Sequence, residues 1–323
     1  MAVYTHLSAE DLAELIAQYD VGRLVSAKGI AEGVSNSNWL VETTGSASAG
    51  TRFILTMYER RIEIEDLPFF LALLDFLSAH DCPVPRTIHD RQGSAFRTID
   101  GKAVALIEFL PGVSVDHPTA AQARAVGVAL ARVHVAARDF DGARTNTLGI
   151  AESRRVLEAC GEVALAAIDP RLPAALALAA DVEAQWPGDL PASVIHSDLF
   201  PDNVLMLGAD VSALIDFYFA CTDAMAYDLA VTHAAWSFDK AGETFSEDVG
   251  TALVEGYESI RTLSARERAC LPILAQGACL RFVASRAEDW IGTPADALVT
   301  RKDPMAFLRR LDFYRAQGTA AFA

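Results

Sequence analysis

The sequence is short of basic residues, which limits the partners that its surface can bind. Its 323 residues include 43 acidic and 27 basic side chains, for a formal net charge of -16. A broad nucleic-acid or anionic-membrane surface needs positive charge, so we expect neither a nucleic acid nor a membrane as a partner. A small basic pocket for a phosphate group remains compatible with this balance.

Long apolar runs, a leader sequence and paired cysteines are also missing. No run approaches the roughly 20 apolar residues of a membrane span, and the N-terminal segment lacks the basic and apolar regions of a signal peptide. The five cysteines are odd in number and have no CxxC spacing; they are Cys82, Cys160, Cys221, Cys270 and Cys279. Reduced thiols and a cytoplasmic location are therefore the expectation.

What is present is the composition of a folded globular protein, with 52 % hydrophobic and 22 % charged residues. The first 109 residues alternate strand-like runs with two helical patterns. One helix is expected to start at Ser8, a capping residue followed by acidic residues, and the other has Pro68 near its first turn. The expected strands are 23–25, 38–42, 52–58, 94–99 and 103–109, and the expected helices are 8–19 and 67–80.

A break at Leu110-Pro111-Gly112 separates this region from a mostly helical one. Helical patterns then cover 118–137, much of 151–187, 225–287 and 303–316, with a strand-loop-strand unit at 192–217 between them. We therefore expect an α+β fold of two lobes. These are a small antiparallel β-sheet lobe at 1–109, a hinge at 110–115, and a larger helical lobe at 116–323 with an inserted β-hairpin.

The loop inside the strand-loop-strand unit carries more polar chemistry than a turn requires. It reads HSDLFPDN, and it places Asp198 and Asn203 five residues apart, with Asp216 at the end of the next apolar strand. Phosphoryl transfer needs one carboxylate to position a hydroxyl and accept its proton, and an amide oxygen and a second carboxylate to hold Mg²⁺ on nucleotide phosphates. The set therefore predicts a kinase of a small hydroxyl compound. Two polar turns beside buried strands are the alternative.

Two histidines and one glycine-containing segment are harder to assign. His196 has no second His or Cys at metal-ligand spacing, so we expect it to bond backbone near the loop. His134 has apolar neighbours on a helix and is expected in the core or just behind the site. The segment 29–38 has two glycines before a strand. It is suited to laying backbone N–H groups along phosphates, and an ordinary turn is the alternative.

These residues carry a resemblance to the aminoglycoside phosphotransferase and choline kinase superfamily, whose members are relatives of the protein kinases. IHSDLFPDNVLM resembles the catalytic loop of that superfamily, and LIDFYFA resembles its metal-binding strand. A narrower resemblance, to the homoserine kinases of the superfamily, runs almost from end to end. It rests on GVSNSNWLVET, RFILTMYERR, LPFFLALLDFL, TNTLGI, VIHSDLFPDNV, LIDFYFACTDAMAYDLAVTHAAW and LRFVASRAEDW.

The resemblance implies a protein-kinase-like fold, in which 1–109 binds the nucleotide and 116–323 carries catalysis and substrate binding. It implies that Asp198 is the catalytic base and that Asn203 and Asp216 bind Mg²⁺. The residues implied to cover the phosphates of ATP are Gly33, Val34, Ser35 and Asn36. The residues whose backbone is implied to meet adenine are Ile107, Glu108 and Phe109.

The implied activity is transfer of phosphate from ATP to the side-chain hydroxyl of L-homoserine, giving O-phospho-L-homoserine for threonine synthesis. An amino-acid substrate needs a cation for its carboxylate and an acceptor for its ammonium group. The candidates are Arg281 and Arg286 for the first and Asp223 and Asp228 for the second. For the arginines, a surface or interlobe salt bridge is the alternative. The rival functions are a kinase of an amino alcohol or an aminoglycoside, and a catalytically silent nucleotide-binding protein.

One position departs from the superfamily pattern. A lysine on the third strand of the small lobe normally pairs with nucleotide phosphates, but here that strand reads FILTMYE and the position is held by Thr56. The candidates to supply the missing charge are Lys28, Arg60 and Arg61, and Glu65 is a candidate acidic partner. This departure bears on the phosphate side of the site and leaves the acid, amide and acid set intact.

Overall fold

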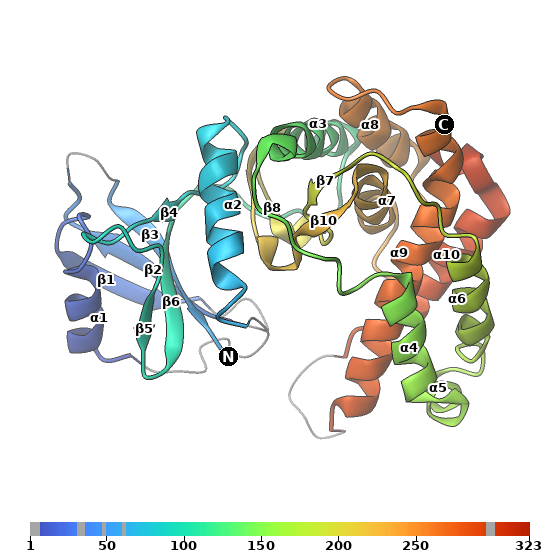
Figure 1. The fold of residues 1–323 in the computed structure, drawn as a ribbon, viewed down its shortest axis with the longest axis horizontal. Helices are drawn as coiled ribbons and strands as arrows, with labels where there is room; N and C mark the ends of the chain where they lie inside the picture. Colours follow the sequence, from blue (N-terminus) through green and yellow to red (C-terminus); the bar gives the residue numbers. More distant parts are fainter. Residues whose placement is uncertain (1–6, 31–35, 47–49, 60–62, 295–300) are drawn as a thin grey trace. The chain divides into compact units, whose positions relative to one another are not determined.

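The computed structural model describes residues 7–30, 36–46, 50–59, 63–294 and 301–323 (Figure 1). The chain divides into two compact units, Met1–Gly112 and Val113–Ala323. The division falls at Leu110-Pro111-Gly112, where the sequence loses its strand pattern. The α+β class predicted from the sequence is confirmed, because one unit is built around a sheet and the other around helices.

The first unit is an antiparallel sheet with strand order β1-β2-β3-β6-β4, and β5 also pairs with β6. Its strands are β1 (Leu24–Gly29), β2 (Asn36–Thr43), β3 (Arg52–Tyr58), β4 (Thr87–Ile88), β5 (Arg97–Ile99) and β6 (Lys102–Glu108). Its helices are α1 (Ala9–Ile16) and α2 (Leu67–Ala79). Every predicted strand is present, and the two-residue β4 is an addition that the sequence pattern is too short to reveal.

Local chemistry explains the turns and the core of this sheet. Asp100 and Gly101 both have positive φ, which is the backbone of a tight hairpin turn between β5 and β6. The side chains of Phe53, Leu55 and Met57 alternate toward one face of β3, where they join a buried cluster with residues of α1. The opposite face of the strand carries Thr56.

The second unit is mostly helical. Its helices are α3 (Ala120–Ala136), α4 (Ile150–Cys160), α5 (Glu162–Ile168), α6 (Ala174–Ala184), α7 (Met225–Trp236), α8 (Glu247–Glu258), α9 (Ala265–Gly292) and α10 (Met305–Gln317). Helix α7 is buried along its whole length, and it packs against α9 (Figure 1). Among the described helices, none combines the length and the apolar character needed to cross a membrane.

The strands of this unit form two small sheets, one of which is the β-hairpin predicted from the sequence. They are β7 (Ala192–Ile195), β8 (Val204–Leu207), β9 (Asp210–Leu214) and β10 (Cys221–Ala224). The predicted inserted hairpin is present, because β8 pairs with β9, and β7 pairs with β10, which the sequence did not predict. A tight turn at Gly208 folds β9 directly onto β8, so β7 takes a partner from further along the chain. The polar loop therefore leads from one small sheet into the other.

Candidate active site

The first residues of the loop between β7 and β8 are hydrogen-bonded to the carboxylate of Asp228. Asp228 lies on α7 and is fully buried. Its two oxygens accept hydrogen bonds from the backbone N–H groups of His196 and Ser197, each at 2.7 Å. Because charge-assisted bonds to a buried carboxylate are strong, they fix the start of the loop on α7.

The carboxylate of Asp228 also contacts a histidine from another helix. His134 of α3 contacts it through Nε2 at 2.9 Å, and the Nδ1 atom of His134 lies 2.8 Å from the Tyr257 hydroxyl. Burial acts to raise the pKa of Asp228, but the hydrogen bonds from His134 and from the backbone N–H of His196 outweigh burial and lower this pKa. Asp228 is therefore an anionic anchor for the loop.

This placement overturns one prediction. Asp228 was a candidate acceptor for a substrate ammonium group, but its side chain has no exposure and both of its oxygens serve the protein. His134 was expected in the core or just behind the site, and its complete burial confirms the first of these positions.

His196 joins the loop to the strand that precedes Asp216. Its Nδ1 atom accepts from the backbone N–H of Asp198 at 3.2 Å, and its Nε2 atom donates to the carbonyl of Ile215 at 2.9 Å. Burial lowers the pKa of His196, which favours the neutral ring that can both accept and donate. The predicted backbone-bonding role of His196 is confirmed.

The ordered set predicted from the sequence is brought together by these bonds. Asn203 donates through Nδ2 to the carbonyl of Asp198 at 2.8 Å and lies 3.5 Å from its Oδ2 atom. The backbone N–H of Ile215 donates to the carbonyl of Asn203 at 3.0 Å, which places Asp216 next to them. The amide nitrogen of Asn203 is thus used by the loop, and its amide oxygen is the atom suited to a cation.

Two backbone positions in this set adopt the left-handed region that non-glycine residues rarely occupy. Ser197 has φ of 60° and Asp216 has φ of 65°. Such residues cost of order 1–3 kcal/mol each and persist where the surroundings fix them. Ser197 directly precedes Asp198, and Asp216 is itself the second acid that the sequence marked, so the strain is located where the backbone must orient these two carboxylates.

The carboxylates of the site raise one another's proton affinity. Burial raises the pKa of Asp198, although Arg281 and His196 act in the opposite direction. Asp216 reaches solvent, but the protein atoms around it and then the charges of Asp198 and Asp202 raise its pKa to about 7. A cluster of like charges in this environment favours the binding of a cation.

Arg281 lies on a helix, as predicted, and its guanidinium contacts the loop that carries Asp198. Its side chain is only 7 % exposed, its Nη1 atom donates to the carbonyl of Ser197, and its Nη2 atom lies 3.6 Å from Oδ1 of Asp198. The rings of Phe219 and Phe282 lie 5.6 and 4.9 Å from the guanidinium carbon. A guanidinium used in this way is poorly placed to anchor a substrate carboxylate, which was its predicted role.

Arg286 and Asp223 keep the access that a substrate contact needs. Arg286 is half-buried and donates to the carbonyl of Asp303 at 2.9 Å. Burial lowers its pKa to about 10, and Arg310 acts in the same direction, whereas Asp198 and Asp202 are among the acids that act against this shift. Asp223 is partly exposed, and its two oxygens accept from Asn146 and from the backbone N–H of Ala224, each at 2.6 Å.

The nucleotide residues predicted in the first unit are only partly described. Gly33, Val34 and Ser35 lie outside the described residues, as do Arg60 and Arg61. Asn36 opens β2, and its buried Oδ1 atom has no hydrogen-bond partner within the described part of the chain. Ile107 and Glu108 are paired within the sheet, where Ile107 faces both Ile54 and Thr87. Phe109 follows the last ladder pair of β6, so its backbone is the freest of the three.

Thr56 occupies the position where the superfamily has a lysine. It is buried, and its hydroxyl donates to Oδ1 of Asn38 at 2.8 Å. Lys102 on β6 pairs with Glu59 at 2.5 Å, but strand alternation places it on the face of Val104, which belongs to the core cluster. The side chain of Lys102 therefore lies on the face of the sheet opposite to Thr56, and Lys102 does not replace the missing lysine. Lys28 and Glu65 are exposed.

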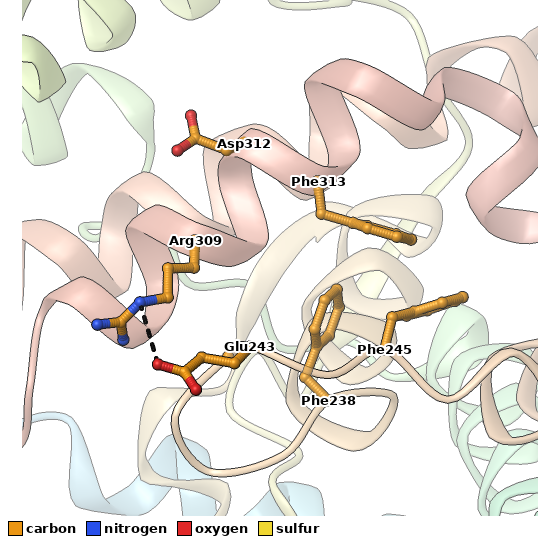
Figure 2. A pocket seen from close by; sticks show the side chains of 7 residues that line it. Phe238, Glu243, Phe245, Arg309, Asp312 and Phe313 are labelled. Atoms are coloured by element: carbon orange, nitrogen blue, oxygen red, sulfur yellow. Dashed lines mark ion pairs between the residues drawn. The ribbon is translucent and has the colours of Figure 1, made fainter.

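A cavity of about 330 Å³ in the second unit is lined by none of the predicted site residues. Figure 2 shows Phe238, Phe245 and Phe313 on one side of it and the ion pair of Arg309 with Glu243, at 3.8 Å, on the other. The cavity lacks the acid, amide and acid set, so phosphoryl transfer is not assigned to it.

The contacts of Asp228 and Arg281 with the loop were not predicted from the sequence. A signal for the first was present, because Asp228 is the only acid in the apolar stretch 224–236. A lone acid in a fully buried helix indicates a buried partner. No comparable signal exists for Arg281, because its partners lie 84 residues away in the chain.

Known proteins of similar sequence indicate the family of the chain. Residues 26–263 match the phosphotransferase enzyme family. A homoserine kinase of Methylobacterium radiotolerans is 49 % identical over 98 % of this chain and 96 % of its own length. A homoserine kinase of Gluconobacter oxydans is 48 % identical over 98 % of this chain and 99 % of its own length.

Solved structures confirm the kinase-like fold. The amicoumacin kinase hAmiN, in complex with AMP-PNP, Ca²⁺ and Ami, has a TM-score of 0.72 at 14 % identity and covers 97 % of this chain and 95 % of its own. A microcompartment-associated aminopropanol kinase has a TM-score of 0.69 at 19 % identity and covers 97 % of this chain and 98 % of its own. The chain therefore belongs to the phosphotransferase enzyme family, and the relatives of similar sequence named above are homoserine kinases.

Proposed function

We propose that the protein is an ATP-dependent homoserine kinase. The observation that carries the proposal is the near-complete coverage of homoserine kinases at almost half identity. In this chain the loop carries Asp198 and Asn203, and the segment with Asp216 is bonded to that loop. The reaction transfers the γ-phosphate of ATP to the side-chain hydroxyl of L-homoserine. O-Phospho-L-homoserine and ADP are the products.

Asp198 is the residue best placed to act as the base. Its carboxylate is 19 % exposed, so it reaches solvent while its backbone is held by His196 and Asn203. In this proposal it orients the attacking hydroxyl and accepts its proton as the oxygen–phosphorus bond forms and the bond to ADP breaks.

Asn203 and Asp216 are the residues that would hold Mg²⁺. The amide oxygen of Asn203 and the carboxylate of Asp216 are hard oxygen ligands of the type that this ion prefers. The described residues contain no group of three or more His, Cys, Asp or Glu side chains that could hold a metal unaided. This fits an ion that completes its coordination with phosphate oxygens and, when bound, neutralises charge on them.

The nucleotide and substrate contacts follow from the remaining residues. We assign the phosphates to Gly33, Val34, Ser35 and Asn36, and adenine to the backbone around Phe109, with Ile107 and Glu108 fixing that strand. For the substrate, Arg286 is our candidate for the carboxylate, because its charge lies in the field of Asp198 and Asp202. Among the described residues, Nη1 is the one atom of its guanidinium with a hydrogen-bond partner. Asp223 is our candidate for the ammonium group.

Asp198→Asn tests the base. The amide is nearly isosteric but cannot accept the hydroxyl proton, and a positioned base commonly contributes about 10²–10⁴-fold. We expect turnover to fall by that factor in a steady-state assay, while ATP affinity measured by calorimetry stays near the wild-type value. Near-normal turnover would remove Asp198 from the chemistry.

Asp216→Ala tests the metal assignment. Loss of one hard oxygen ligand should weaken Mg²⁺-dependent nucleotide binding and lower activity together. The measurement is nucleotide affinity with and without Mg²⁺, and we expect the difference between the two to shrink. Asp239→Ala, which removes an acid from a loop of the same unit, is the control. If nucleotide binding by Asp216→Ala keeps the full Mg²⁺ dependence, Asp216 is a turn residue only.

A substrate panel tests the acceptor. With MgATP, we expect ADP release to be far faster with L-homoserine than with L-serine or choline. Serine is one methylene shorter, and a misplacement of about 1 Å can cost about 10²-fold. Choline has no carboxylate, so a cation waiting for one is left unpaired.

Two additions make the panel decisive. Arg286→Gln should raise KM for homoserine much more than KM for ATP if Arg286 holds the substrate carboxylate. Faster turnover of choline or kanamycin than of homoserine would contradict the homoserine assignment while leaving the kinase assignment in place.

A further inference from the structure

The peptide groups around Ser197 form hydrogen bonds with side chains from two different helices. Asp228 of α7 accepts from the N–H of Ser197, and Arg281 of α9 donates to its carbonyl. The hydroxyl of Ser197 also donates to the carbonyl of Phe219 at 2.9 Å. A residue with left-handed backbone directly before Asp198 is thereby held at three atoms.

The same guanidinium also faces the carboxylate that follows Ser197. Its Nη2 atom lies 3.6 Å from Oδ1 of Asp198, which is longer than a hydrogen bond but within the range of an ion pair. The second oxygen, Oδ2, lies on the side of Asn203. A rigid guanidinium fork that touches both the loop carbonyl and the carboxylate limits how Asp198 can rotate.

Arg281 is itself rigid, which a positioning residue requires. It is nearly buried, and the rings of Phe219 and Phe282 lie against its guanidinium. Tyr227 of α7 is a further neighbour; burial raises the pKa of Tyr227 to about 12, against the effect of the Arg281 charge. The other charged or titratable groups around Asp198 are His196, Asp202, Asp216, Arg286 and Lys302.

We propose that Arg281 is a positioning residue for the phosphoryl transfer, fixing Asp198 in the orientation that meets the acceptor hydroxyl. The inference rests on the proposed role of Asp198 as the base. In this proposal Arg281 orients a residue of the loop. The sequence had instead suggested that Arg281 contacts the substrate.

A double-mutant cycle tests this inference. Turnover is measured under single-turnover conditions for the wild type, Arg281→Met, Asp198→Asn and the double variant, with whichever acceptor the wild type uses best. We expect Arg281→Met to lower the rate about 10²-fold, with KM for the acceptor nearly unchanged. In the Asp198→Asn background the same change should cost less than about threefold, because the group it positions is already gone.

Controls separate positioning from a general loss of structure. Arg281→Lys keeps the charge and stem but loses the fork, so we expect it to recover part of the rate and to give the cycle a second, better-folded form. Arg310→Met removes another buried arginine, one that donates to the carbonyls of Ala234 and Asp239. It should lower the melting temperature and change the rate by the same factor in both backgrounds.

Three results would overturn the inference. If the losses of Arg281→Met and Asp198→Asn multiply, Arg281 acts independently of Asp198. If Arg281→Met raises KM for the acceptor at unchanged rate, Arg281 binds the substrate. If Asp198→Asn keeps full turnover, Asp198 is not the base, and the role of Arg281 fails together with that assignment. A change of preferred acceptor alone would refute the homoserine proposal and leave the cycle interpretable.

Discussion

Two backbone N–H groups that share one buried carboxylate are the interaction on which the site depends. Asp228 receives the N–H groups of His196 and Ser197, and His134 faces the same carboxylate. An unpaired buried charge is costly, so each partner requires the others. The network links α3, α7 and the loop, and it fixes the backbone position directly before Asp198. Helix α7 is buried along its whole length, which gives the anchor a rigid base.

The loop is then aligned by bonds that each connect it to another segment. His196 reaches the carbonyl of Ile215, and Asn203 reaches the carbonyl of Asp198. These bonds offset the strained backbone of Ser197 and Asp216. The consequence is a site in which carboxylates remain close to one another despite their repulsion, which is the condition under which a cation and a phosphate chain are bound together.

Much of this was predictable from the sequence, for identifiable reasons. The strands 192–195 and 204–207 and the set of Asp198, Asn203 and Asp216 follow from local patterns, and the fold class follows from the change of periodicity near Leu110. Strand pairing was not predictable in the same way, because β10 is four residues long and includes polar ones. The roles of Asp228 and Arg281 depend on contacts across 31 and 84 residues of chain, and local periodicity carries no information about them.

The most direct test of the anchor is amide hydrogen exchange in Asp228→Asn. An asparagine has one acceptor oxygen where the aspartate has two, so at least one loop N–H loses its charged partner, at a cost of about 1–3 kcal/mol. We expect the loop peptide that contains His196 and Ser197 to exchange about tenfold faster or more, with β8 and β9 unchanged and turnover reduced. Unchanged protection of that peptide, together with normal turnover, would contradict the account.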